Sequence, residues 1–421
     1  MFSLLDLAAI LLTLSALFGW LNHKFIPLPH TIGLLVMSVA TSVVLVTIDL
    51  IFPDRHLFDA LTAALLQIDF SAVVMNGMLG FLLFAGALHV DLGKLRSRAV
   101  PVTILAGLGT VISTAAIGCG IWEAARWMGQ PMTFAWALVF GALISPTDPI
   151  AVLSVLKNVN IPASLEVEMQ GEALFNDGVG IVLFTVLLRF AAGGGQDTSL
   201  SAIAELLLLE AGGGLLLGIV TGYVAYQGMR FIDDYSIEVL ISLALVTGTY
   251  ALAQRLHVSG PLSVVAAGLL IGDRGPRYAM SDRTQTYVFA LWTLIDEILN
   301  SVLFLLIGLE VLVLRFEASS LLLAVAAIPI ALLARLLAVT APPLVFACSK
   351  LMSVHNVPFL TWAGVRGGIS VALALSVPDS PAKPAILAAT YAVVLFSIII
   401  QGSTLGIVAK RTVRSKTEGP R

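Results

Sequence analysis

The sequence predicts an all-α integral membrane protein with about 13 transmembrane helices. Of its 421 residues, 58% are hydrophobic and only 12% are charged, whereas a soluble domain carries about 25% charged residues. The apolar residues form segments along the whole chain, each close to the roughly 20 residues that a spanning helix needs. We place these helices at 3–22, 30–52, 70–90, 100–128, 134–156, 165–191, 201–228, 236–255, 259–272, 286–314, 318–348, 357–378 and 384–409. Residues 1–410 then form the transmembrane domain and residues 411–421 a short basic tail.

The basic residues predict the orientation of the chain. With the N-terminus outside, 15 of the 23 Lys and Arg residues fall in inner loops or the tail, and six fall outside. Membrane proteins carry an excess of Lys and Arg in their cytoplasmic loops. We therefore expect a multi-pass protein of the cell (inner) membrane, with the N-terminus outside and the C-terminus in the cytoplasm. The basic tail is suited to contact anionic membrane lipids.

An odd number of helices predicts two inverted six-helix repeats joined by a linking helix. On this division the fifth helix of each half is interrupted, by Ser145-Pro-Thr-Asp-Pro149 in the first half and by Gly364-Val-Arg-Gly-Gly-Ile-Ser370 in the second. Interrupted helices at matching places in two inverted halves are typical of secondary transporters and mark the transport site. We expect the two interrupted helices to cross there.

Composition argues against several other classes of function. The formal net charge of −3 indicates no nucleic-acid partner. Cys119 and Cys348 both lie in apolar runs, and neither the cysteines nor the six histidines have the spacing of a metal site. We therefore expect neither an enzyme nor a bound cofactor.

The first interruption places a carboxylate at membrane depth. Pro149 has no N–H and its ring clashes with the carbonyl four residues earlier, so the backbone at Thr147 and Asp148 should be unwound. Such backbone is tolerated in a membrane only where it is buried in protein or lines water. One alternative is that Asp148 only caps the next half-helix. Because an acid at this depth is unfavourable without a task, we predict that Asp148 and Thr147 supply oxygens to a cation site.

A second polar cluster lies near the head of segment 165–191. Glu172 and Asn176 are four residues apart and share a helix face, whereas Asp177 is turned about 100° further round. Hard cations favour carboxylate and carbonyl oxygens, and a partly desolvated carboxylate also holds a proton more readily. One acid can thus bind either a proton or a cation, which is the chemical basis of exchange. The alternative is a polar cluster that only joins helices.

Two arginines lie inside predicted helices. A buried Arg needs a carboxylate partner, and we predict that Arg366 pairs with Glu172. This structural ion pair would leave Asp148 and Asp177 free for ions. Arg335 either pairs with an acid or extends to the interface, and the sequence leaves both possibilities open.

Asp296, Glu297 and Asn300 form a third polar group. We read them as the beginning of a helix that ends at Glu310, where acids are favoured at the interface. Asn300 is the better candidate for a supporting role near the site, as is Arg335.

These motifs resemble those of the monovalent cation:proton antiporters, in the branch that contains bacterial sodium/proton antiporters and animal sodium/proton exchangers. The matching stretches are Gly141-Ala-Leu-Ile-Ser-Pro-Thr-Asp-Pro-Ile150, Gly171-Glu-Ala-Leu-Phe-Asn-Asp-Gly-Val179 and Gly364-Val-Arg-Gly-Gly-Ile-Ser370. The resemblance extends over the whole membrane part. A Thr-Asp-Pro break followed by an Asn-Asp pair is specific to this family, although either motif alone would be a weak signal.

The resemblance implies a role for each matching residue. Asp177 is the ion- and proton-binding acid, and Asp148 and Thr147 complete the Na⁺ site beside Asn176. The family implies a homodimer whose core domain moves against a dimerisation domain, an elevator-like form of alternating access. Because this branch carries Asn-Asp rather than Asp-Asp, electroneutral exchange is implied. Some relatives use a Ser hydroxyl where this chain has Ala173, so water or an oxygen of Asn176 or Thr147 would take its place.

The sequence therefore predicts an antiporter that exchanges Na⁺ or Li⁺ for H⁺. A K⁺/H⁺ antiporter of the same fold is the nearest alternative. A cation channel would use the same acids as a selectivity ring. An intramembrane aspartyl protease would need a Gly-x-Gly-Asp-type site, for which Ile271-Gly-Asp273 is only a partial match.

Overall fold

The computed structural model describes residues 4–26, 28–52, 69–148, 152, 161–193, 200–312, 318–345 and 356–412. Within these ranges the regular structure is entirely helical. Ten of the described helices are long and apolar enough to cross a membrane. The predicted class, a multi-pass α-helical membrane protein, is confirmed. The count of 13 spans and the inverted repeats stay predictions, as does the tail, which lies almost wholly outside the described residues.

Each of the 13 predicted segments contains at least one helix. The long helices are α1 (Leu4–Phe25), α2 (His30–Ile51), α8 (Thr110–Trp127), α11 (Ala163–Ala191), α12 (Leu200–Arg230), α13 (Tyr235–Arg255), α14 (Gly260–Tyr278), α15 (Asp282–Glu310) and α16 (Ala318–Val345). The shorter ones are α4 (Phe70–Ala72), α5 (Leu79–Leu88), α6 (Leu92–Ser97), α7 (Ala99–Thr103), α9 (Phe134–Ile144), α17 (Val357–Trp362), α18 (Gly368–Ser376), α19 (Lys383–Phe396) and α20 (Ser403–Thr412). The π-helical segments η2 (Val73–Met78), η3 (Ile104–Gly109) and η6 (Ser397–Gly402) join α4 to α5, α7 to α8 and α19 to α20.

Polar residues just before several helices determine where those helices begin. Asp234 accepts hydrogen bonds from the backbone N–H groups of the first turn of α13. Ser259 and Ser281 do the same for α14 and α15. These caps satisfy N–H groups that have no partner inside the helix. The starts of these three helices are therefore determined by the residues directly before them.

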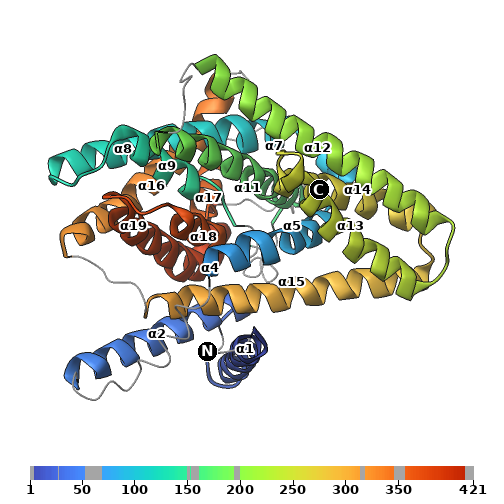
Figure 1. The fold of residues 1–421 in the computed structure, drawn as a ribbon, viewed down its shortest axis with the longest axis horizontal. Coiled ribbons are helices and arrows are strands. Elements are labelled where there is room, and N and C mark those ends of the chain that lie inside the picture. The colour runs from blue at the N-terminus through green and yellow to red at the C-terminus, as the bar shows by residue number, and fades with distance from the viewer. Residues whose placement is uncertain are drawn as a thin grey trace, which may run out of the picture.

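Two groups of helices lie on different sides of the molecule (Figure 1). α12, α13 and α14 pack together on one side, and α8, α9, α16 and α19 on the other. The long helix α15 crosses the molecule below both groups in this view, and α1 and α2 lie on its far side (Figure 1). α5 packs against α14, whereas α11 lies between the two groups and contacts both α9 and α14.

A row of glycines brings α12 and α14 into close contact. A Cβ atom added at Gly214 or Gly218 would collide with the backbone carbonyl of Ser259 or Ser263, and one at Gly222 would lie 3.0 Å from the Cα atom of Ala267. Small residues spaced four apart let helix backbones approach closely in membranes, where van der Waals packing drives association. Close van der Waals packing therefore stabilises the contact between α12 and α14 more than polar contacts do.

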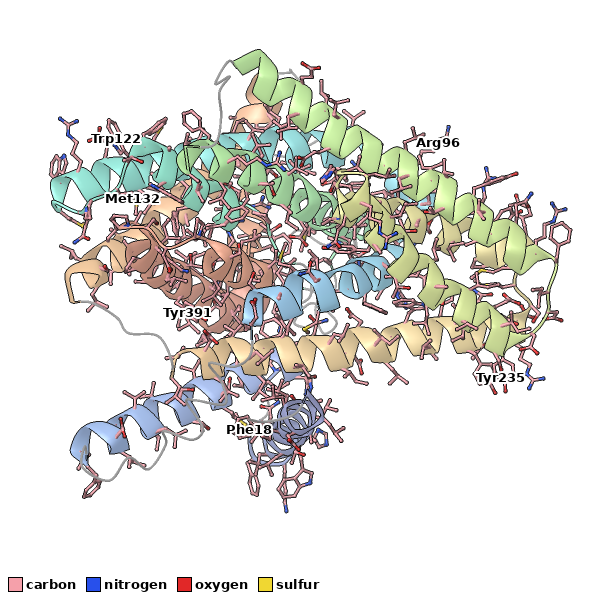
Figure 2. The ribbon with its side chains drawn as sticks, in the orientation of Figure 1. Phe18, Arg96, Trp122, Met132, Tyr235 and Tyr391 are labelled. Atoms are coloured by element: carbon pink, nitrogen blue, oxygen red, sulfur yellow. The ribbon has the colours of Figure 1, made fainter. Side chains whose placement is uncertain are left out.

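The side chains at the surface of the molecule differ from those in its interior (Figure 2). Leu208, Leu216 and Val224 project from α12 and are largely exposed, as expected of a helix that faces lipid. Trp122 and Tyr235 lie at the periphery of the molecule (Figure 2), whereas Tyr391 is buried within the bundle. The exposed surface is thus apolar along the helices, as a bilayer requires.

Candidate functional site

The two interrupted helices meet, as the sequence predicted. α9 ends at Ile144 and residues 145–148 are not helical; α17 ends at Trp362 and α18 begins only at Gly368. The backbone N–H of Asp148 donates to the carbonyl of Val365 over 2.8 Å. Unwound backbone in a membrane must find partners within the protein, and here one break supplies a partner for the other. The alternative role of Asp148, as a cap of the next half-helix, concerns positions outside the described residues.

Gly367 makes room for the carboxylate of Asp148. A Cβ atom at this position would collide with Oδ2 of Asp148 and lie 2.7 and 2.8 Å from its Cβ and Cγ. The same packing recurs at Gly180 of α11, where a Cβ would collide with the ring of Pro146. Both glycines are therefore needed for close approach, which is a frequent use of this residue beside functional backbone.

Thr147 and Asn176 hold each other by two hydrogen bonds. The side-chain Nδ2 of Asn176 donates to Oγ1 of Thr147 over 2.9 Å, and the backbone N–H of Thr147 donates to Oδ1 of Asn176 over 3.3 Å. Both residues are buried. Asn176 therefore ties α11 to the unwound segment after α9, and each of the two oxygens keeps one lone pair for a further ligand.

Asp148 and Asp177 line one cavity of about 590 Å³. Asp177 is buried and Asp148 is half-buried. The cavity wall also contains Asp296 and Glu297, and among the described lining residues there is no Lys or Arg. Thr147 and Asn176 lie behind this wall and do not line it. The structure thus brings together the two predicted ion-binding acids in a chamber whose formal charge is negative.

The predicted pairing of Glu172 with Arg366 is wrong. The ion-pair partner of Glu172 is Arg335 of α16: its Nη1 contacts Oε1 and its Nη2 donates to Oε2 over 3.0 Å. Arg335 Nε also donates to the carbonyl of Leu360 over 3.2 Å, and Gly364 lies against the Arg335 side chain with no room for a Cβ. Of the two possibilities left open for Arg335, pairing with an acid is therefore the one observed.

Arg366 binds the end of a broken helix instead. Its Nη1 donates to the carbonyls of Ser145 and Pro146, the latter over 2.8 Å. These carbonyls follow the last turn of α9, where the interruption leaves them without helical partners. A cation is also favoured at this end of a helix, which carries partial negative charge. The free carbonyls thus satisfy Arg366 without a carboxylate.

Ser397 contacts the site, although the sequence did not predict a role for it. Its Oγ accepts from the backbone N–H of Arg366 over 3.0 Å and donates to the Arg366 carbonyl over 3.2 Å. Ser397 begins the π-helical segment η6, and such segments often occur at functional sites. A single Ser in an apolar run gives no local signal of this contact.

The third polar group lies elsewhere on its helix than predicted. Asp296, Glu297 and Asn300 are in the middle of α15, which begins at Asp282, because Ser281 caps the helix four turns earlier. All three residues line the cavity that contains Asp177. They are therefore part of the site and not interfacial acids at a helix start.

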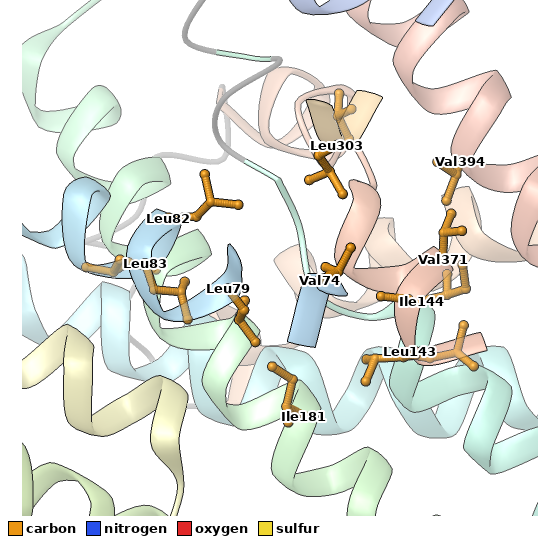
Figure 3. Packing of buried hydrophobic residues seen from close by; sticks show 14 of the residues in the cluster. Val74, Leu79, Leu82, Leu83, Leu143, Ile144, Ile181, Leu303, Val371 and Val394 are labelled. Carbon is orange, nitrogen blue, oxygen red and sulfur yellow. The ribbon is translucent and has the colours of Figure 1, made fainter. Parts of the chain in front are cut away.

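A second cavity of about 580 Å³ lies further along α11. α11 contributes Gln170, Leu174 and Asp177 to the first cavity, and Ile181 and Thr185 to the second. Buried apolar side chains from other helices surround Ile181 in this part of α11; they include Val74, Leu79, Leu143, Ile144 and Val371 (Figure 3). α11 thus presents its acid to one cavity and an apolar turn to the other.

Comparison with known proteins agrees with this geometry. The family described as the transmembrane sodium/hydrogen exchanger matches residues 11–411. The chain is 44% identical over 413 residues to the Na⁺/H⁺ antiporter NhaP of Pseudomonas aeruginosa, covering 97% of each chain. It is 37% identical over 347 residues to the Na⁺/H⁺ antiporter NhaH of Halobacillus aidingensis, covering 81% of this chain and 83% of that one.

The fold also has a counterpart among solved structures. The sodium proton antiporter MjNhaP1 of Methanocaldococcus jannaschii, at pH 8, superimposes with a TM-score of 0.75. The match covers 97% of this chain and 98% of the other. Because the sequence identity is only 20%, the match shows a shared fold and nothing more. The family match over nearly the whole chain and the high identity to NhaP carry the assignment: the protein belongs to the sodium/hydrogen exchanger family.

Proposed function

We propose that this protein is a secondary active transporter that exchanges Na⁺ or Li⁺ for H⁺ across the membrane. The observation that carries the proposal is the pair of carboxylates, Asp148 and Asp177, in one cavity whose described wall contains no Lys or Arg. Carboxylate oxygens suit a hard cation, and a carboxylate in a confined site also binds a proton. Asp177 alternates between the two, and Na⁺ excludes H⁺ because both need the same oxygens.

The charges of the core support electroneutral exchange. Glu172, Asp177, Arg335 and Arg366 are buried in the core, and Asp148 is half-buried. Arg335 neutralises Glu172, so this ion pair adds no net charge to the site. Asp177 is then neutralised by either one proton or one monovalent cation. Neutral Asn176 adds no charge to this count, so each cycle exchanges one cation for one proton.

The two cavities suggest how access alternates. The first cavity is lined by His89 and Val90, which precede the short helix α6 with Lys94 and Arg96. The excess of basic residues favours a cytoplasmic position for α6. We infer that the site faces the cytoplasm here and that the apolar turn of α11 around Ile181 separates it from the second cavity. Movement of α9 and α11 against the group formed by α12, α13 and α14, within a homodimer, would expose Asp177 to the other side.

Proteoliposomes provide the test. We expect Na⁺ and Li⁺ to drive proton movement, measured as dequenching of a pH-sensitive dye, and Asp177→Asn to abolish it. Asp282→Asn removes an exposed acid from the start of α15 and serves as the matched control, with activity retained. Normal exchange by Asp177→Asn would refute the proposal. A larger response to K⁺ than to Na⁺ would identify a K⁺/H⁺ antiporter instead.

A further inference from the structure

A second set of side chains with oxygen atoms lines the cavity, on α15. Asp296 and Asn300 are one helical turn apart, and Glu297 lies beside them. α15 is separate in sequence from the segments that carry Asp148 and Asp177. The same chamber therefore has acids on two unconnected parts of the chain.

Asn300 lines this chamber and is almost fully buried. Its Nδ2 donates to the backbone carbonyl of Asp296 over 2.8 Å and to Oδ1 of Asp296 over 3.0 Å. Its Oδ1 is buried and has no hydrogen-bond partner among the described residues. The opposite orientation of the amide would place Oδ1 against a carbonyl and a carboxylate, so the two hydrogen bonds determine which atom is the oxygen. A buried oxygen without a partner is unfavourable, and a cation would satisfy it.

The electrostatics of the cavity favour a positively charged occupant. Asp148, Asp177, Asp296 and Glu297 all line it, and the described lining includes no Lys or Arg. Acids of one sign in a cleft with low-dielectric walls raise the local concentration of counter-ions. The described residues contain no group of three or more His, Cys, Asp or Glu side chains that could hold a metal ion. A cation at α15 would therefore keep part of its water shell and bind weakly.

We propose that Asp296 and Asn300 form a second, low-affinity site for a partly hydrated monovalent cation on its way to Asp177. Asn300 Oδ1 and the Asp296 carboxylate supply two oxygens, and water supplies the rest. Weak binding suits such a position, because a transported ion must be attracted and then released. The site rests on the proposed function, since its cation is the one that Asp177 exchanges.

Kinetics in proteoliposomes separate this role from a structural one. We expect Asp296→Asn and Asn300→Ala to raise the KM for Na⁺ by about tenfold, equivalent to the loss of one good ligand, and to leave the maximal rate within about twofold. Asp296→Glu keeps the charge and should recover most of the affinity. Asp282→Asn, on the same helix and outside the cavity, is the matched control for loss of charge. An unchanged KM in Asp296→Asn and Asn300→Ala would overturn the proposal.

Direct binding distinguishes the second site from the first. In purified Asp177→Asn protein, radioactive Na⁺ should still bind with low affinity, and the double variant Asp177→Asn/Asp296→Asn should lose this binding. If Asp177→Asn already abolishes all binding, the second site does not exist, although the proposed exchange at Asp177 stands. If Asp177→Asn transports normally, the proposed function fails first. Should Asp296→Asn not fold, Asn300→Ala supports the same comparison.

Discussion

The guanidinium of Arg335 and the carboxylate of Glu172 form a two-pronged ion pair that joins α16 to α11. Both side chains are almost fully buried, with 7% and 2% of their residue surface exposed. Truncating one partner of a buried pair leaves the other charge uncompensated, which costs about 3–5 kcal/mol. We therefore expect Arg335→Ala to lower the unfolding temperature of the purified protein strongly, and Arg335→Lys to lower it less, because Lys keeps the charge but loses the second prong.

The control for this prediction is Arg255→Ala, which removes an exposed arginine at the end of α13 and should change stability little. The double variant Glu172→Gln/Arg335→Met removes both charges and should be more stable than Arg335→Ala alone. Equal unfolding temperatures for Arg335→Ala and Arg255→Ala would show that the pair does not stabilise the fold.

Asn176 determines the charge moved in each cycle, according to the proposed mechanism. Exchange by the unmodified protein should be insensitive to an imposed membrane potential. Asn176→Asp adds a carboxylate beside Thr147 and removes the Nδ2 donor of the 2.9 Å hydrogen bond. We expect its residual exchange to depend on the potential, measured with valinomycin and a K⁺ gradient across proteoliposomes. Strong voltage dependence of the unmodified protein would contradict electroneutral exchange.

Gly367 tests the contact between the two broken helices. A Cβ atom there would collide with the Asp148 carboxylate, so Gly367→Ala should displace it and reduce exchange by about tenfold or more, since misplaced groups lose rate steeply. Gly212→Ala is the control, because a Cβ at Gly212 meets no atom within 4 Å. Circular dichroism should show unchanged helix content in both variants. Full exchange by Gly367→Ala would mean that the position of Asp148 is not critical.

Protons and Na⁺ should compete for Asp177. As the pH falls, a larger fraction of the acid is protonated, and Na⁺ must displace that proton before it binds. We expect the KM for Na⁺ to rise by about tenfold for each unit of pH below the pKa of the site, as for any single-proton competition. The maximal rate at saturating Na⁺ should change much less. Initial rates at several pH values and Na⁺ concentrations measure both quantities, and a KM that does not change with pH would exclude a shared site.

The helices and their interruptions were predictable because their causes are local. About 20 apolar residues in a row favour a spanning helix wherever they occur, and Pro146 and Pro149 interrupt a helix by their own geometry. The π-helical segments η2, η3 and η6 were not predicted. They change the hydrogen-bonding register within a helix, and the apolar sequences that form them do not differ visibly from the flanking helices.

The partners of the arginines were not predictable from local rules. Glu172 and Arg335 are 163 positions apart, and Arg366 lies more than 200 positions from the carbonyls that it binds. Any buried acid can pair with any buried base, so the sequence limits the possible partners of each arginine but does not identify the actual one. The position of Asn300 is a similar case: its helix was recognisable, but not the cavity that it faces.

The sequence by itself determined that this chain is a multi-pass membrane protein with acids at two marked places, Asp148 and Asp177. It did so because hydrophobic length, proline breaks and the rarity of acids in membranes act within a few residues of the chain. Only the tertiary structure decided that Arg335 neutralises Glu172, that Arg366 holds the end of α9, and that Asp296 and Asn300 share a cavity with Asp177. Those contacts join helices that are distant in the sequence, and the packing of all the helices together determines which of these helices come into contact.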